Sequence, residues 1–153
     1  MSSSPSNKKS NRDHLSKNER SRNMSKIRQK DTRPETLLRK FLFRNGFRYR
    51  INVKKLPGTP DIVLRKYKTV IFVHGCYWHR HDCRKGRSMP SVRKEFWGKK
   101  FQDNINRDKK ARNLLSKEGW KVIIVWECEL SNVTNRKERL TKLIDEINSD
   151  ESR

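Results

Sequence analysis

The residues of this chain best suited to chemistry lie together in one short segment, VIFVHGCYWHRHDC, residues 70–83. It holds three of the four histidines and two of the three cysteines. Thiolate and imidazole are the usual ligands of a structural Zn²⁺, which takes four of them in a tetrahedron. Cys76, His81 and Cys83 supply three ligands. Cys128, in the later segment WEC, is the remaining cysteine, so the sequence predicts a Cys3His zinc site. The alternative is three ordinary buried or free cysteines.

A zinc site of this composition leaves His74 and His79 without a ligand role, and histidine is suited to proton transfer near neutral pH. Upstream, GTPDIVL places Asp61 at the start of a strand, and the next strand ends at Val73. An aspartate opposite the end of its hairpin partner can hold Mg²⁺, whose bound water can become a nucleophile. The alternatives are two core or surface histidines and an ordinary Pro-Asp turn.

Hydrophobic periodicity predicts the elements that position these residues. The segment DTRPETLLRKFLFRNGF predicts a helix with Thr32 as N-cap, Pro34 in the first turn and Gly46 at the end. Further expected elements are a strand in FRYRINV, a DIVL–TVIFV hairpin, helices in SVRKEFWGKK and NINRDKKARNLLSKEG, a buried strand in WKVIIVWE and a helix over 136–147. This order predicts an α/β fold, a central mixed β-sheet flanked by helices. Trp120 and Trp126 are assigned to the core.

Composition points to a polyanionic partner. The 153 residues suffice for one domain, and 39 Lys and Arg against 17 Asp and Glu give a formal net charge of +22. Basic residues spread along the whole chain favour nucleic acid over a membrane, and binding should weaken steeply with salt. Residues 1–23 predict a disordered basic arm, which leaves 24–153 as the folded domain. Three cysteines, an odd number, favour a reducing compartment or metal ligation.

The motifs together resemble a known family. PD followed by a hairpin and FVH is similar to a variant of the PD-(D/E)xK nuclease core, with Phe72 and His74 in place of the second acid and the lysine. With HGCYWHRHDC, EFW, NINRDKK and GWKVIIVWECEL, residues 21–130 resemble the very short patch repair (Vsr) DNA mismatch endonucleases. The resemblance implies a restriction-endonuclease-like core with a structural zinc loop. It also implies a Mg²⁺-dependent nick on the 5′ side of the thymine in T:G mismatches, which arise when 5-methylcytosine deaminates.

The resemblance also implies roles for individual residues. Asp61 matches the Mg²⁺-binding aspartate, and the main-chain carbonyl of Val73 matches a second ligand. His79 matches the histidine that activates water, and Glu35 an acid that supports the metal site through water. His74 matches the histidine of the altered third motif. The family's structural zinc ligands match the same three cysteines and His81 that the residue count selects.

A further set of residues matches the family's contacts with DNA. Aromatic side chains on the zinc loop and the following helix match a wedge that enters beside the mismatch from the major groove. Two apolar residues near the N-terminus match side chains that enter from the minor groove, and two polar residues match contacts with the mismatched pair. The wedge residues are Tyr77, Trp78 and Trp97. The residues on the minor-groove side are Met24 and Ile27, and those that contact the mismatched pair are Lys100 and Asn104.

The expected partner is double-stranded DNA carrying a T:G mismatch, with other mismatch-repair proteins as further partners. We expect a monomer in the bacterial cytoplasm, associated with the nucleoid and not with a membrane. Two alternatives stay open: a non-catalytic, zinc-stapled DNA-binding module, and a related nuclease of a restriction-modification system. A ribosomal-type RNA binder is weaker, because it would not need a zinc loop beside an acidic strand.

Overall fold

The computed structural model describes residues 31–149 of the chain. The chain divides into two units, residues 1–32 and 33–153, and every described helix and strand belongs to the second. The predicted arm, residues 1–23, and its boundary at residue 24 lie outside the described residues.

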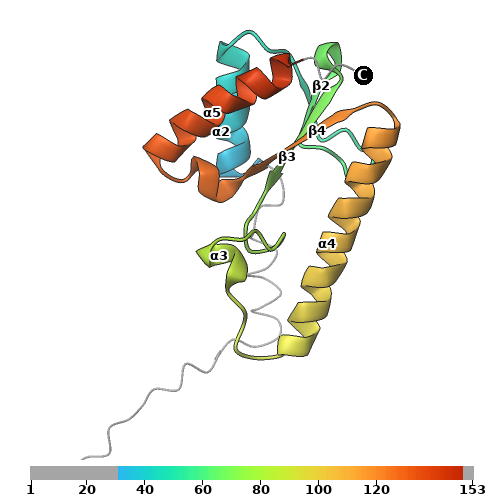
Figure 1. The fold of residues 1–153 in the computed structure, drawn as a ribbon, viewed down its shortest axis with the longest axis vertical. Helices are drawn as coiled ribbons and strands as arrows, with labels where there is room; N and C mark the ends of the chain where they lie inside the picture. The colour runs from blue at the N-terminus through green and yellow to red at the C-terminus, as the bar shows by residue number, and fades with distance from the viewer. Residues whose placement is uncertain (1–30, 150–153) are drawn as a thin grey trace, which may run out of the picture. The chain divides into compact units, whose positions relative to one another are not determined.

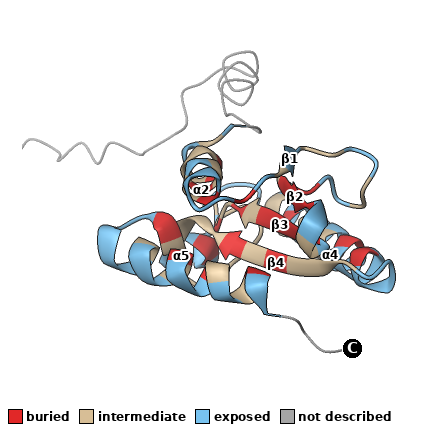
Figure 2. Ribbon diagram, turned by 90° about the horizontal axis from the view of Figure 1, so that it is seen from above, coloured by how far each residue is buried: buried red, intermediate tan, exposed pale blue. Residues whose placement is uncertain are grey.

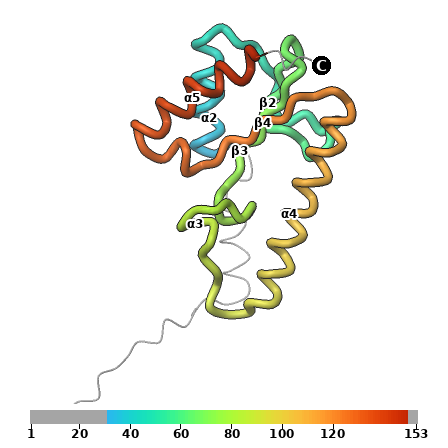
Figure 3. The backbone as a smooth tube through the Cα atoms, in the orientation of Figure 1, coloured from blue at the N-terminus to red at the C-terminus, as the bar shows by residue number. Residues whose placement is uncertain are grey.

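The second unit is built on a four-stranded sheet with the strand order β1-β2-β3-β4. The strands are β1 (Arg50–Ile51), β2 (Ile62–Leu64), β3 (Thr69–His74) and β4 (Lys121–Trp126). The first three pair antiparallel, whereas β3 and β4 run parallel. Parallel neighbours need a long crossover, and Figure 3 shows the chain leaving β3, passing through a loop and returning along helix α4 to β4.

Helices cover both faces of this sheet, so the predicted α/β fold with a mixed sheet is confirmed. Helices α2 (Arg33–Arg44) and α5 (Val133–Asn148) lie side by side on one face, and α4 (Lys94–Lys117) lies on the other (Figure 1). Successive residues of a strand point to opposite faces. Ile71 therefore joins the core under α2 and α5, while Val70 and Phe72 join the core under α4. Figure 2 shows buried residues concentrated on the strands and on the inner sides of the helices.

Helix α2 follows its sequence signals closely. Pro34 and Glu35 stand in its first turn, and Leu38 and Leu42, one turn apart, are fully buried. Gly46 adopts a φ of +85°, the left-handed conformation that ends a helix. Three shorter helical segments are η1 (Arg65–Tyr67) in the β2–β3 hairpin, α3 (Arg84–Arg87) and η2 (Glu127–Leu130).

The two helices predicted between residues 91 and 119 are one continuous helix, α4, of 24 residues. The prediction of a break was wrong because the buried face continues through it. Phe101, Ala111 and Leu115 are the buried residues of α4, and their spacing keeps them on one side of a single helix. No described helix is long and apolar enough to cross a membrane.

The strand predicted in FRYRINV is also much shorter than expected. Only Arg50 and Ile51 pair with β2, and both are exposed. Asn52 then adopts a φ of +49°, which interrupts the extended backbone. Phe47 is buried, whereas Ile51, which an uninterrupted strand would place on the same side, is exposed.

Gly58 is required in the turn that leads to Asp61. Its φ is +73°, and a Cβ atom there would lie 2.7 Å from the side chain of Ala111 on α4. Only glycine combines this backbone conformation with such a close approach. The packing of this turn on α4 therefore sets the path of the chain into β2.

Candidate active site and metal centre

The candidate active site lies at the edge of the sheet where β3 and β4 end. His74 is the last residue of β3, and its register partner is Trp126, the last residue of β4. Asp61 precedes β2, and its Oδ2 accepts a hydrogen bond of 2.7 Å from the main-chain N–H of Val73. The hairpin therefore brings Asp61 beside the end of β3, as its position in the sequence predicts.

The carboxyl of Asp61 is in an unfavourable place for a negative charge. Its pKa is raised from 3.8 to about 6, mainly by burial and to a smaller extent by the nearby carboxylate of Glu35. The hydrogen bond from Val73, then Arg39 and His79, act in the opposite direction. Both groups lie at the end of β3, because Asp61 is hydrogen-bonded to Val73 and His79 stacks on His74, the next residue of that strand.

A divalent cation fits this acidic corner. Glu35 is only 3% exposed, and its Oε2 lies 3.1 Å from Nη2 of Arg39. A cation beside Asp61 would offset the charge that burial disfavours. Mg²⁺ takes one or two carboxylates and keeps several waters, and this donor set suits it. The ion itself and the carbonyl of Val73 as its ligand stay predictions.

His79 is held by a carboxylate from the opposite side of the site. Its Nδ1 lies 2.5 Å from Oδ2 of Asp108, on α4. An ionised carboxylate can only accept, so Nδ1–H is the donor, and this leaves Nε2 as the basic nitrogen. The main-chain N–H of His79 also donates to the carbonyl of Gly75 at 3.2 Å. His79 is thus oriented to accept a proton at Nε2.

His74 is buried and lies face to face with His79. The ring centroids are 3.8 Å apart and the planes 5° from parallel, and His74 is 6% exposed. The pKa of His74 is lowered to about 4, mainly by burial and to a smaller extent by His79. One ligand atom each from His74, His79 and Asp108 lies within 4.8 Å of the others. Stacked rings, however, hold their nitrogen lone pairs in parallel planes, a geometry that does not suit joint ligation of one metal by both histidines.

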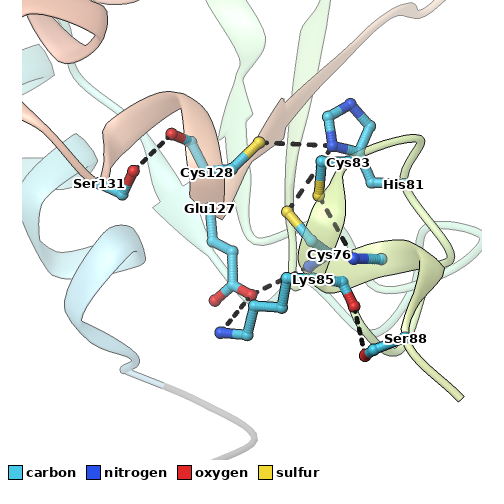
Figure 4. A network of polar contacts seen from close by, with 9 residues as sticks. Cys76, His81, Cys83, Lys85, Ser88, Glu127, Cys128 and Ser131 are labelled. Carbon is cyan, nitrogen blue, oxygen red and sulfur yellow. Dashed lines mark hydrogen bonds and ion pairs between the residues drawn. The ribbon is translucent and has the colours of Figure 1, made fainter.

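The four predicted zinc ligands come together in one cluster. One ligand atom each from Cys76, His81, Cys83 and Cys128 lies within 4.8 Å of the others, and Figure 4 shows the side chains pointing toward one another. Nδ1 of His81 is 3.4 Å from Sγ of Cys128 and 3.7 Å from Sγ of Cys76. Burial raises the pKa of the Cys76 thiol to about 12. Three sulfurs and one imidazole in a partly buried place fit Zn²⁺, although the identity of the ion stays a prediction.

Local backbone geometry supports the cluster. The main-chain N–H of Gly86 donates to Sγ of Cys83 at 3.3 Å and lowers the pKa of that thiol. A Cβ atom at Gly86 would lie 1.9 Å from the carbonyl oxygen of His81. Any other residue at position 86 would force the loop apart, so glycine is what lets α3 pack against His81.

A charged pair joins the cluster loop to η2. Oε1 of Glu127 accepts a hydrogen bond of 3.1 Å from the main-chain N–H of Cys76 and lies 2.9 Å from Nζ of Lys85 (Figure 4). Glu127 immediately precedes Cys128 along the chain. The two halves of the cluster, which come from distant parts of the sequence, are therefore also joined outside the sulfur atoms.

The predicted aromatic wedge residues form one cluster with Phe101 of α4. The ring centroids of Trp78 and Trp97 are 6.0 Å apart, and Tyr77 meets Trp78 edge to face at 5.0 Å. Tyr77, Trp78 and Trp97 are half-buried rather than fully exposed, and they lie over the buried ring of Phe101. The cluster presents aromatic surface supported from below by the helix.

Lys100 and Asn104, two of the remaining residues predicted to contact DNA, lie on α4 beside the aromatic cluster. Nζ of Lys100 lies 5.4 Å from the ring centroid of Trp97, and Nδ2 of Asn104 donates to the carbonyl of Trp78 at 3.2 Å. Both residues therefore adjoin the aromatic cluster. Met24 and Ile27 lie outside the described residues.

Two residues of this region were missed or misassigned from the sequence. Asp108 was assigned no role from the sequence beyond its place in a predicted helix and in the motif NINRDKK, although Asn104 and Asp108 are one helical turn apart and both contact the loop. That spacing of polar groups on α4 was the available signal. Trp126, assigned to the core, is only half-buried and lies between His74 and His81, with ring-centroid distances of 5.3 and 4.3 Å.

The fold and the site define a class of protein: an α/β protein with an acidic corner, a carboxylate-held histidine and an adjoining Cys/His cluster that could hold a metal ion at one edge of its sheet. Residues 12–85 match the family model described as DNA mismatch endonuclease Vsr. The chain belongs to the Vsr family of DNA endonucleases.

Three curated relatives support this membership. The chain is 54% identical over 124 residues to the type II nicking enzyme V.NmeAIP of Neisseria meningitidis serogroup A. The aligned part is 81% of this chain and 88% of the relative. It is 44% identical over 133 residues to the type II nicking enzyme V.XorIIP of Xanthomonas oryzae pv. oryzae, covering 87% and 97%. It is 42% identical over 122 residues to the DNA mismatch endonuclease Vsr of Escherichia coli, covering 80% and 75%.

The low pKa of His74 predicts a change in stability with pH. Its folded pKa of about 4 lies below the ordinary value of 6.5, so the native state binds this proton less readily than the unfolded chain. The associated stability is complete above pH 6.5 and is lost as pH falls toward 4. Between pH 7.5 and 5 we expect wild type to lose about 2 kcal/mol relative to His74→Gln, measured by denaturant unfolding. Equal pH dependence in both proteins would contradict the burial of a neutral His74.

The cluster predicts that Cys83→Ser loses its metal. Serine oxygen is a poor substitute for thiolate on Zn²⁺, so we expect metal content to fall from about one ion per chain to near zero, with a lower melting temperature or misfolding. Ser88→Ala is the matched control, since Ser88 follows α3 and its hydroxyl donates to Lys85 rather than to the cluster. Metal analysis by mass spectrometry and thermal unfolding provide the measurements. A Cys83→Ser protein that is metal-free and as stable as wild type would disprove a structural role for the ion.

Proposed function

We propose that this protein nicks one strand of duplex DNA on the 5′ side of the thymine in a T:G mismatch, in a Mg²⁺-dependent reaction that starts very short patch repair. The observation that carries the proposal is that Asp61 contacts Val73 and that the His79–Asp108 pair stacks on His74, so both groups meet at the end of β3. Membership of the Vsr family supplies the class of substrate, and one relative bears the name DNA mismatch endonuclease.

The chain's own residues would perform the hydrolysis as follows. Asp61, supported by Glu35, would hold Mg²⁺, which when bound supplies positive charge to the scissile phosphate. His79 would accept a proton from the attacking water at Nε2, while Asp108 keeps its ring oriented. His74, neutral at pH 7, would support the ring of His79 by stacking. The products would be a 5′-phosphate and a 3′-hydroxyl.

Recognition of the mismatch would fall to the aromatic cluster. Tyr77, Trp78 and Trp97 present rings beside the active site, and insertion of such rings unstacks a base step at a cost of a few kcal/mol. A mismatched step should cost less to unstack than a paired one. The wedge would therefore distinguish a T:G mismatch from a paired base step by the energy of unstacking as well as by direct contact. Lys100 and Asn104 adjoin the wedge.

A strand-specific nicking assay tests the proposal. End-labelled duplexes that differ only in carrying T:G or C:G at one position are incubated with and without Mg²⁺. We expect a single nick 5′ of the thymine in the T:G duplex, no cut in C:G, and no reaction without the metal. Binding without nicking under every metal condition would instead support the non-catalytic module.

A second candidate is a nicking activity that belongs to a restriction-modification system. The observation that favours it is the name type II nicking enzyme carried by two of the relatives. The same assay on T:G duplexes with varied flanking sequence separates a general mismatch enzyme from one confined to a methylation site. Cutting of fully paired duplex would favour a third activity, cleavage of unmodified DNA.

The cellular setting is proposed on the same basis. We propose that the enzyme acts as a monomer in the bacterial cytoplasm, on nucleoid DNA, with other mismatch-repair proteins as further partners. The net charge of +22 supports a DNA partner.

A further inference from the structure

One aromatic side chain touches both the metal cluster and the histidine pair. The indole of Trp126 stacks on the ring of His81, a member of the cluster, with centroids 4.3 Å apart and planes 16° from parallel. It meets His74 edge to face, with a centroid distance of 5.3 Å and an angle of 71°. His74 in turn stacks on His79. Four rings therefore form a continuous series from the metal cluster to the proposed base.

Trp126 is the firmly held member of this series. It ends β4 and pairs in register with His74 of β3. Its main-chain N–H donates to Oε1 of Glu129 at 3.0 Å, and Oε2 of Glu129 lies 2.6 Å from Nε of Arg139 on α5. The backbone that carries the indole is thus held by the sheet and, through Glu129, by α5, both outside the loop that the indole contacts.

The loop that carries the proposed base depends on contacts with its surroundings, among them the hydrogen bonds with Asp108 and Asn104 of α4. Residues 75–83, between β3 and α3, contain no helix or strand. His79 and His81 both stand on this loop, and each stacks on a ring supplied by the sheet: His79 on His74, and His81 on Trp126. The loop is therefore held to the ends of β3 and β4 at two points by stacked rings.

We propose that Trp126 is a positioning residue: its indole holds His81 and His74 so that His79 keeps its place for proton transfer. This inference rests on the proposed hydrolytic function. The alternative is that Trp126 only fills apolar space. The two roles need different side chains at position 126. Positioning by stacking needs a flat ring, whereas space filling needs only apolar volume.

Replacement of Trp126 by a ring and by an aliphatic chain separates these readings. For Trp126→Leu we expect kcat for nicking to fall about 100-fold, the scale of a displacement of roughly 1 Å in a catalytic group. KM and DNA affinity should stay near wild type, and the metal should stay bound. Trp126→Phe keeps a ring at the position and should keep kcat close to wild type.

The chain contains a matched control in Trp120, which immediately precedes β4. Trp120 packs on the core under α4 and lies beneath Nζ of Lys68, and no ring contact joins it to either histidine among the described residues. Trp120→Leu and Trp120→Phe should leave kcat unchanged after correction for any loss of folded protein. If Trp126→Leu does not fold, Trp126→Met serves in its place, since methionine fills irregular gaps without a ring.

A measurement without turnover keeps this inference separate from the proposed function. The imidazole NMR signals of His79, which stacks on His74 rather than on Trp126, should shift in Trp126→Leu and stay in place in Trp120→Leu. Shifted signals in a protein that nicks no duplex at all would sustain the positioning role and refute only the nicking activity. Unchanged signals, wild-type kcat in Trp126→Leu, or equal losses in the Phe and Leu variants would overturn the positioning role.

Discussion

Asp61→Asn is expected to abolish nicking and, at the same time, to make the metal-free protein more stable. Asparagine has nearly the same shape and can still accept the hydrogen bond from Val73, but it carries no charge to hold a divalent ion. A bound metal contributes several kcal/mol to such a reaction, and about 4 kcal/mol corresponds to a 10³-fold rate. We therefore expect nicking to fall by about 10³-fold or more, while binding to T:G duplex largely persists.

The gain in stability follows from the raised pKa of Asp61. The folded value of about 6 exceeds the ordinary 3.8, so the native state disfavours the ionised carboxylate. This penalty is fully present above pH 6 and disappears as pH falls toward 3.8, the reverse of the usual case for a paired aspartate. Its upper limit is about 3 kcal/mol. In buffer without divalent cations, Asp61→Asn should therefore exceed wild type in unfolding free energy by up to this amount at pH 7, and by much less at pH 4.

Asp103→Asn provides the matched control for both measurements. Asp103 lies exposed on α4, so its replacement removes one negative charge without touching the site. It should change neither nicking nor the pH dependence of stability. An Asp61→Asn enzyme that nicks at the normal rate would refute the metal-binding role, and one that is less stable than wild type at pH 7 would refute the strain on the buried carboxylate.

His79→Ala should lower nicking by about 10²- to 10⁴-fold, the usual contribution of a general base. The loss should appear in kcat rather than in DNA affinity, because the proposed role of His79 is proton transfer. Single-turnover nicking of a T:G duplex, together with a binding titration on the same duplex, measures the two quantities separately. Normal single-turnover rates in His79→Ala would assign proton transfer to another group.

Asp108→Asn tests how His79 is oriented. An amide in place of the carboxylate weakens the 2.5 Å contact with Nδ1 and no longer stabilises a protonated ring. Groups that orient a functional histidine in this way are typically worth 10- to 100-fold, so the loss should be smaller than for His79→Ala. Asp103→Asn, five residues earlier on the same helix, is again the control. A loss of DNA binding in Asp108→Asn with unchanged chemistry would mean that Asp108 acts on the DNA and not on His79.

Local sequence was sufficient to predict those helices, strands and turns that depend only on residues close together in the chain. Pro34 and Gly46 mark the two ends of α2, and the apolar run in TVIFV marks β3 as a buried strand. The hairpin places Asp61 beside the end of β3 because only a short turn separates β2 from β3. The cysteine count selected Cys128 as the fourth member of the cluster. Local reasoning failed where a pattern has two readings, as in the predicted break within α4.

The sequence by itself determined which chemical groups are present, which local elements carry them and which family they indicate. Only the tertiary structure decided how groups from distant segments meet. Asp108 reaches His79 across 29 positions of the chain, and Cys128 reaches His81 across 47. The parallel pairing of β3 with β4 places Trp126 beside His74. The pKa values of Asp61 and His74 were equally a result of folding, because burial and neighbouring charges, which set them, exist only once the sheet and its helices have packed together.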